Sequence, residues 1–154
     1  MSKLCAIFGE NPDELEFGYD EEYYTCSKMK LRLVLAMQKL VESGCIGFIS
    51  TVDQGASMWG AEACIAMRES GVSVKLIAVP TSELQASRWH PERREHYYNV
   101  LEAADKVVEQ KKVSADDYIF ANITHAIFLG DTDIPRLAAL LERAQEVGAE
   151  IIRV

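Results

Sequence analysis

Short apolar runs alternate with longer amphipathic stretches along this chain of 154 residues. Three of the short runs, at 46–50, 74–79 and 125–129, are almost continuously apolar. That pattern is typical of strands buried on both faces of a parallel sheet. With the weaker runs included, the predicted strands are Leu4–Phe8, Ile46–Ser50, Val74–Val79, Lys106–Val108, His125–Leu129 and Glu150–Val154.

The amphipathic stretches between these runs predict helices with recognisable ends. Gly44 suits the position after a helix C-terminus, and Pro91 suits a first helical position. Ser114 with Asp117 three residues later resembles a capping box, and Asp133 is the expected N-cap of the last helix. The predicted helices are Glu21–Ser43, Ala56–Ser70, Pro91–Ala104, Ser114–Ala121 and Ile134–Val147.

This strict alternation predicts an α/β fold with a Rossmann-like, doubly wound and mostly parallel sheet of about six strands flanked by helices. No linker, repeat or low-complexity segment interrupts the pattern, so we expect one domain over residues 1–154. No apolar run approaches the roughly 20 residues that span a bilayer. The first eight residues lack the features of a signal peptide, and we therefore expect a cytoplasmic protein without membrane contact.

Composition narrows the classes of partner. The net charge of −8 and pI near 4.9 provide no basic field for nucleic acid, so general nucleic-acid binding is disfavoured. A local cationic pocket for one small phosphate is compatible with this charge. The cysteines form no CxxC pair, which argues against a zinc ribbon or a thioredoxin-type site. Cys5, Cys45 and Cys64 lie in apolar segments and are predicted to be small buried hydrophobes.

In doubly wound sheets, ligands bind outside the carboxyl ends of the strands, where the strand order reverses. The candidate loops therefore follow Phe8, Ser50, Val79 and Leu129. The first contains Gly9 and Glu10, and Gly9 permits either a tight approach to a ligand or a plain turn.

The second candidate loop, Thr51–Ser57, leads from a strand into a helix and contains Asp53, Gln54 and Gly55. Free amides and the helix dipole at such a junction form an anion site. Asp53 is either the cap of this helix or a contact to a ribose hydroxyl.

The third and fourth candidate loops are also polar. Pro80–Glu83 is followed by Trp89, which lies beside Arg88 and His90 and offers a stacking surface for a base. Alternatively this stretch is a solvated helix start in which arginines 93 and 94 pair with neighbouring glutamates. In the fourth loop, Gly130 precedes Asp131, which either accepts from a ribose hydroxyl or caps the turn.

Motifs for catalysis are absent. The sequence contains no GxSxG elbow and no HExxH pair, and His90 and His96 lack a third ligand at metal-like spacing. We therefore predict no metal site and no cofactor. Glu62 is the one carboxylate placed for acid–base work, and a single carboxylate does not make a mechanism.

Two long segments carry a resemblance to a known family. The run FISTVDQGASMWGAEACIAMRES (48–70) and the run LIAVPTSELQASRWHPERREHYYNVLEAADKVV (76–108) resemble the YpsA-like branch of the SLOG superfamily. AIFGENP (6–12) and AIFLGD (126–131) extend the similarity. The resemblance implies a Rossmann-like sheet and a site for a nucleotide or an ADP-ribose-like derivative. The contacts that it implies are Gly9, Thr51, Gln54, Gly55, Glu62, Pro80, Trp89 and Gly130.

The sequence departs from that family's phosphate-binding pattern in two loops. Val52 stands where a second small residue is expected, and GDTDIPR (130–136) replaces a glycine-glycine-threonine loop. The PGGxGTxxE motif of the superfamily's cytokinin-activating (LOG-type) hydrolases is missing, which argues against phosphoribohydrolase activity.

Three hypotheses follow. The leading one is a small-molecule binding module, a sensor for a nucleotide-derived ligand without turnover. The second is a nucleotide N-glycosidic hydrolase in which Glu62 is the acid–base residue. The third is a protein-interaction module with a vestigial pocket. On this hypothesis a homodimer forms through the Glu21–Ser43 helix, whose apolar residues cover more than one face: Leu31, Leu33, Val34, Leu35 and Met37.

Overall fold

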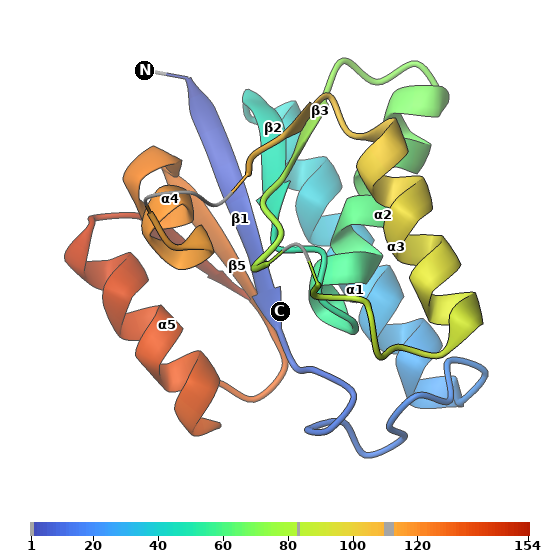
Figure 1. Ribbon diagram of the computed structural model, residues 1–154. Coiled ribbons are helices and arrows are strands. Elements are labelled where there is room, and N and C mark those ends of the chain that lie inside the picture. Colours follow the sequence, from blue (N-terminus) through green and yellow to red (C-terminus); the bar gives the residue numbers. More distant parts are fainter. Residues whose placement is uncertain (1, 83, 110–112) are drawn as a thin grey trace.

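The computed structural model describes residues 2–82, 84–109 and 113–154. Within these residues, six strands form one sheet in the order β4-β3-β2-β1-β5-β6, and each neighbouring pair is parallel (Figure 1). The predicted fold class is confirmed. The strands are β1 (Lys3–Gly9), β2 (Cys45–Ser50), β3 (Lys75–Ala78), β4 (Lys106–Val107), β5 (His125–Leu129) and β6 (Glu150–Arg153).

Helices cover both faces of this sheet. They are α1 (Tyr24–Glu42), α2 (Ala56–Glu69), α3 (Pro91–Ala103), α4 (Ala115–Asn122) and α5 (Pro135–Glu146). The first three lie on one face and the last two on the other (Figure 1). The chain moves outward from β1 to β4 and then crosses back to β5 and β6. Right-handed crossovers in opposite directions place the helices on opposite faces.

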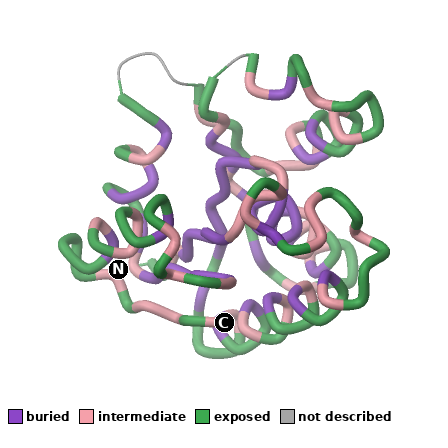
Figure 2. The backbone as a smooth tube through the Cα atoms, turned by 90° about the horizontal axis from the view of Figure 1, so that it is seen from below, coloured by how far each residue is buried: buried purple, intermediate pink, exposed green. Residues whose placement is uncertain are grey.

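The core lies on both sides of the central strands. One buried cluster joins the sheet to α1, α2 and α3, and a second joins it to α4 and α5. Figure 2, seen from below the view of Figure 1, shows the buried residues in the middle of the molecule and the exposed ones around its rim. Cys5, Cys45 and Cys64 are buried with free thiols, as predicted, and Cys26 is buried as well.

Helix α1 places its apolar residues on two faces. Leu33 and Met37 are buried against the sheet, whereas Leu31 and Leu35 are 59% and 48% exposed. The sheet therefore accounts for part of the apolar pattern, and the homodimer contact through this helix stays a prediction.

Some of the capping residues predicted for the helix N-termini are correct and one is wrong. Ser114 Oγ accepts a hydrogen bond from the Asp117 amide at 3.1 Å, and Pro91 is the first residue of α3, both as predicted. The prediction for Asp133 is wrong, because the N-cap of α5 is Ile134. Pro135 occupies the first turn, and a residue before proline is held extended, which sets the boundary one residue later.

Candidate functional site

A groove crosses the carboxyl ends of β1 and β2 on the face covered by α2 and α3. In the described part of the chain it consists of three adjoining cavities whose walls all include Tyr19 and Gln54, and we call it the Trp89 groove. The narrow pocket, which reaches Glu62 and His96, has about 20 Å³, room for about one water molecule. The other two cavities have about 180 and 410 Å³ and also share Trp89.

The two larger cavities carry opposite charges. The acidic compartment, of about 180 Å³, is lined by Asn11, Pro12, Asp13, Tyr19, Asp53, Gln54 and Trp89. The basic compartment, of about 410 Å³, is lined by Tyr19, Gln54, Arg88, Trp89, His90, Glu92 and Arg93. Two aromatic rings and one carboxamide therefore stand between a pair of carboxylates and a pair of guanidinium groups.

Trp89 belongs to both the core and the groove. Its half-buried ring meets Tyr97 edge-on, with 5.3 Å between the ring centroids and 81° between the planes. It also packs against the hydrophobic cluster of the α2–α3 side. The tryptophan in this polar stretch is thus anchored by packing while it lines both compartments.

Asp53 lies in the groove, and helix cap, one of the two roles predicted for it, is wrong. The N-cap of α2 is Gly55, at φ 93° and ψ −141°, a conformation that glycine adopts at low cost. Asp53 Oδ1 instead accepts from Gln85 Nε2 at 2.6 Å. Burial raises the pKa of the Asp53 carboxyl above its usual value, against the lowering effect of the hydrogen bond from Gln85.

The loop between Ser50 and Gly55 is held from several sides. Gln85 Nε2 also donates to the Thr51 carbonyl oxygen at 3.0 Å, and Thr51 itself is buried. The Val52 amide donates to Ser50 Oγ at 3.0 Å. Val52 is fully buried at φ 60°, an uncommon conformation for a β-branched residue. The bulky residue is therefore accommodated at a backbone position that favours glycine.

The first amide of α2, on Ala56, is not free, contrary to the expectation for this junction. The Ala56 amide donates to the Glu10 carbonyl oxygen at 3.3 Å. A Cβ on Gly55 would fall on that same oxygen, so the backbone of residues 10 and 11 approaches this glycine closely. The segment between β1 and α1, residues 10–23, which we call the strap, thus contacts the start of this helix.

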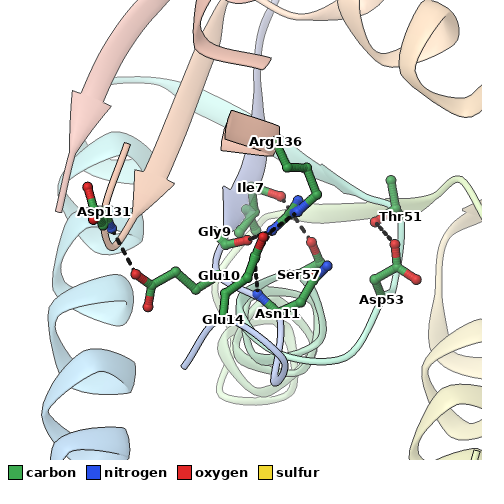
Figure 3. Close-up of polar contacts among 10 residues, drawn as sticks. All are labelled: Ile7, Gly9, Glu10, Asn11, Glu14, Thr51, Asp53, Ser57, Asp131 and Arg136. Atoms are coloured by element: carbon green, nitrogen blue, oxygen red, sulfur yellow. Dashed lines mark hydrogen bonds and ion pairs between the residues drawn. The ribbon is translucent and has the colours of Figure 1, made fainter. Parts of the chain in front are cut away.

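The strap also closes the crevice between β1 and β5, where the strand order reverses (Figure 3). Glu10 Oε1 accepts from the Asp131 amide at 3.0 Å, and its carboxylate carbon lies only 2.7 Å from where a Cβ on Gly130 would stand. Arg136, in the first turn of α5, donates to the Gly9 carbonyl oxygen and to Glu14 Oε1, both at 2.6 Å. The structure therefore brings Gly9, Glu10, Gly130 and Asp131 together, but in this crevice and not among the residues that line the Trp89 groove.

Asp131 has the simpler of its two predicted roles. Its Oδ1 accepts from the Asp133 amide at 2.9 Å and so caps the turn before α5. Pro80 lines a different cavity of about 520 Å³, beside Tyr97 and Tyr98 at the β3–β4 edge. Glu83, in the same predicted loop, lies outside the described residues.

The two histidines near α3 have partners other than a metal. His90 Nδ1 accepts from the Glu92 amide at 3.4 Å and caps the helix. His96 Nδ1 lies 2.9 Å from Glu62 Oε2 at the end of the narrow pocket. Among the residues that the structure describes, no cluster of three or more potential metal-ligating side chains occurs.

Arg93 does not pair with a glutamate of its own helix. It forms an ion pair with Glu21 and donates to the Tyr19 carbonyl oxygen at 2.7 Å, so it ties the strap to α3. Tyr19, Gln85 and Arg136 were not predicted as site residues, because their roles depend on contacts between distant segments. The one signal for Tyr19 is its aromatic ring in an otherwise acidic segment.

The chain matches the family model YpsA, described as the YspA SLOG family, over residues 5–133. It belongs to this family. Two curated relatives, both UPF0398 proteins, come from Bacillus pumilus (29% identical over 106 residues) and Halalkalibacterium halodurans (31% over 105 residues). Each match covers 68% of this chain, and 56% and 55% of those relatives. The matched segment therefore spans little more than half their length.

A solved structure shares the fold of this YpsA-family chain. DNA processing protein A (DprA) from Streptococcus pneumoniae matches with a TM-score of 0.64 at 14% identity, covering 99% of this chain and 50% of that one. At that identity the likeness shows the fold alone. None of the helices in the described residues has the length and apolarity needed to cross a membrane.

Proposed function

We propose that this chain is a binding module that holds a nucleotide or nucleotide-derived ligand, such as an ADP-ribose-like molecule, in the Trp89 groove without turnover. The observation that carries the proposal is the make-up of the groove. Tyr19 and Trp89 offer aromatic faces, and Gln54, Asp53 and Arg88 place polar groups around them.

The size and chemistry of the groove support such a ligand. Small-molecule sites commonly enclose about 300–1,000 Å³ and combine apolar or aromatic walls with a few polar groups. The basic compartment alone has about 410 Å³. A base stacks on aromatic rings irrespective of its identity, and hydrogen-bonding groups then select among bases. Gln54 Oε1 is buried and has no hydrogen-bond partner among the described residues, so a donor on a ligand that reached this wall of the groove would satisfy it.

Equilibrium binding tests the proposal. Isothermal titration calorimetry with adenosine, AMP, ADP, NAD and ADP-ribose is expected to find at least one ligand that binds with a dissociation constant below millimolar. Trp89→Ala is expected to weaken that binding by roughly 5- to 150-fold, the range for loss of one stacking contact of about 1–3 kcal/mol.

Tyr24→Ala provides the matched control, because Tyr24 is a 70% exposed aromatic residue of α1 that lines none of the described cavities. The affinity of the Tyr24→Ala variant for the same ligand is expected to equal that of the wild type. Absence of binding to the whole panel at millimolar concentration would overturn the proposal.

The hydrolase alternative has one observation in its favour, the contact between Glu62 and His96. A carboxylate beside an imidazole can move a proton, but both side chains are 40% or more exposed and the adjoining pocket is narrow. Chromatography of nucleoside monophosphates after incubation distinguishes the two functions. Release of free base by the wild type, abolished in Glu62→Gln, would establish the hydrolase in place of the binding module.

A further inference from the structure

The Trp89 groove is electrically polarised, and this polarity bears on how a nucleotide would lie in it. The acidic compartment presents Asp13 and Asp53, and no cation is among its described lining residues. The basic compartment presents Arg88, Arg93 and His90 against the single carboxylate of Glu92 among the residues that line it. The aromatic residues Tyr19 and Trp89 belong to both compartments.

Within the basic compartment, Arg88 is the cation open to a ligand. Arg93 is already paired with Glu21 and with the Tyr19 carbonyl oxygen. His90 Nδ1 accepts from the Glu92 amide. Among the described residues the Arg88 side chain has no hydrogen-bond or ion-pair partner. A guanidinium group presents two parallel donors that match a phosphate.

The positions where a doubly wound fold usually places phosphate are closed by the chain itself. The donors at the β1–β5 crevice are the Asp131 amide and the Arg136 guanidinium (Figure 3). Glu10 occupies the first and Glu14 occupies the second. The first amide of α2, on Ala56, is bonded to the Glu10 carbonyl oxygen. A phosphate in the β1–β5 crevice would meet the carboxylates of Glu10 and Glu14.

We infer that the ligand of the Trp89 groove lies with its phosphate on Arg88 in the basic compartment, and its ribose diol or base amine at Asp53 in the acidic compartment. Hydroxyl or amino groups of the ligand would donate hydrogen bonds to the Asp53 carboxylate. The carboxylate also accepts hydrogen bonds from Gln85 and Thr51. A phosphate placed there would be repelled by two carboxylates. Arg88 is therefore a specificity-determining residue that selects phosphate-bearing ligands. This inference rests on the proposed function.

Calorimetric titration with adenosine, AMP and ADP tests this orientation in wild type, Arg88→Gln, Arg32→Gln and Glu10→Gln. Arg32 is the matched control, an exposed arginine of α1 that lines none of the described cavities. Arg88→Gln is expected to weaken the binding of AMP and ADP about tenfold or more, because it removes charge-assisted hydrogen bonds to the phosphate. The affinity for adenosine is expected to stay within about twofold of the wild-type value. Arg32→Gln and Glu10→Gln are expected to match the wild type.

Two results would overturn the inferred orientation of the ligand. If AMP and ADP bind the wild type but Arg88→Gln weakens them no more than adenosine, the phosphate does not lie on Arg88. If Glu10→Gln tightens the binding of AMP and ADP while the affinity for adenosine is unchanged, the phosphate lies in the β1–β5 crevice. Both outcomes leave the proposed function standing. If none of adenosine, AMP, ADP, NAD and ADP-ribose binds the wild type, the proposed function and the orientation are removed together.

Discussion

At the scale of single residues, the loop after β2 shows how contacts from elsewhere decide what a side chain does. Asp53 precedes a helix and has the residue type of an N-cap. In the fold, Gly55 starts that helix and Gln85 binds the carboxylate. Local sequence predicted that Asp53 is important in this loop, but its partner lies 32 residues away and carries no local signal.

Gly55 provides the sharpest test at this scale. Gly55→Ala is expected to destabilise the protein by more than the roughly 1–3 kcal/mol cost of a residue in a sparsely populated conformation, because its Cβ would also meet the Glu10 carbonyl oxygen. Chemical denaturation measures the difference.

Gly71→Ala separates the two contributions to that cost. Gly71 has φ 100°, and a Cβ there would meet nothing within 4 Å. This variant is therefore expected to lose free energy of unfolding only through its unfavourable backbone conformation. Equal losses of stability in the two variants would show that the close approach of the strap to Gly55 contributes nothing.

At the scale of elements, periodicity predicted strands and helices well because packing on a sheet imposes it. The order of β1 to β6, the buried runs in β2 and β5, and the cap of α4 by Ser114 all follow from short-range patterns. The strap did not. Its conformation depends on Glu10, Glu14 and Glu21 finding partners beyond the β-α unit in which they lie.

The contact between the strap and α5 makes a pH-dependent contribution. The hydrogen bonds from Arg136 lower the pKa of the Glu14 carboxyl from its ordinary value of 4.5. A carboxyl whose pKa is lower in the folded state stabilises the fold above its unfolded pKa, and that contribution is lost as the pH falls through the folded pKa. We therefore expect it to be complete near neutral pH and to decline below about pH 4.5.

Glu14→Gln tests this contribution. The wild type is expected to exceed the variant in free energy of unfolding at pH 7, and the difference is expected to shrink between pH 4.5 and lower values. Urea titrations across that range measure it. Glu16→Gln is the control, because Glu16 lies in the same segment but is not a partner of Arg136. A difference that does not change with pH would contradict the role given to Glu14.

At the scale of the whole molecule, the predicted fold indicated the edge of the sheet for the candidate site but not the position of the site along that edge. The candidate loops do meet at the carboxyl ends of the strands. They divide into a crevice filled by the chain's own carboxylates and a groove beside α2 and α3. Sequence patterns locate loops, whereas side chains crossing from the strap and α5 decide which of them stays open.

A nucleotide-derived ligand is expected to bind in the Trp89 groove and not in the β1–β5 crevice. An amide-resolved NMR titration with ADP-ribose distinguishes these two places. Binding in the groove predicts saturable shifts of the Trp89 indole N–H and the Gln54 side-chain amide, while the amide of Asp131 stays unchanged. Shifts confined to Gly130 and Asp131, or no saturable shift at millimolar ADP-ribose, would contradict it.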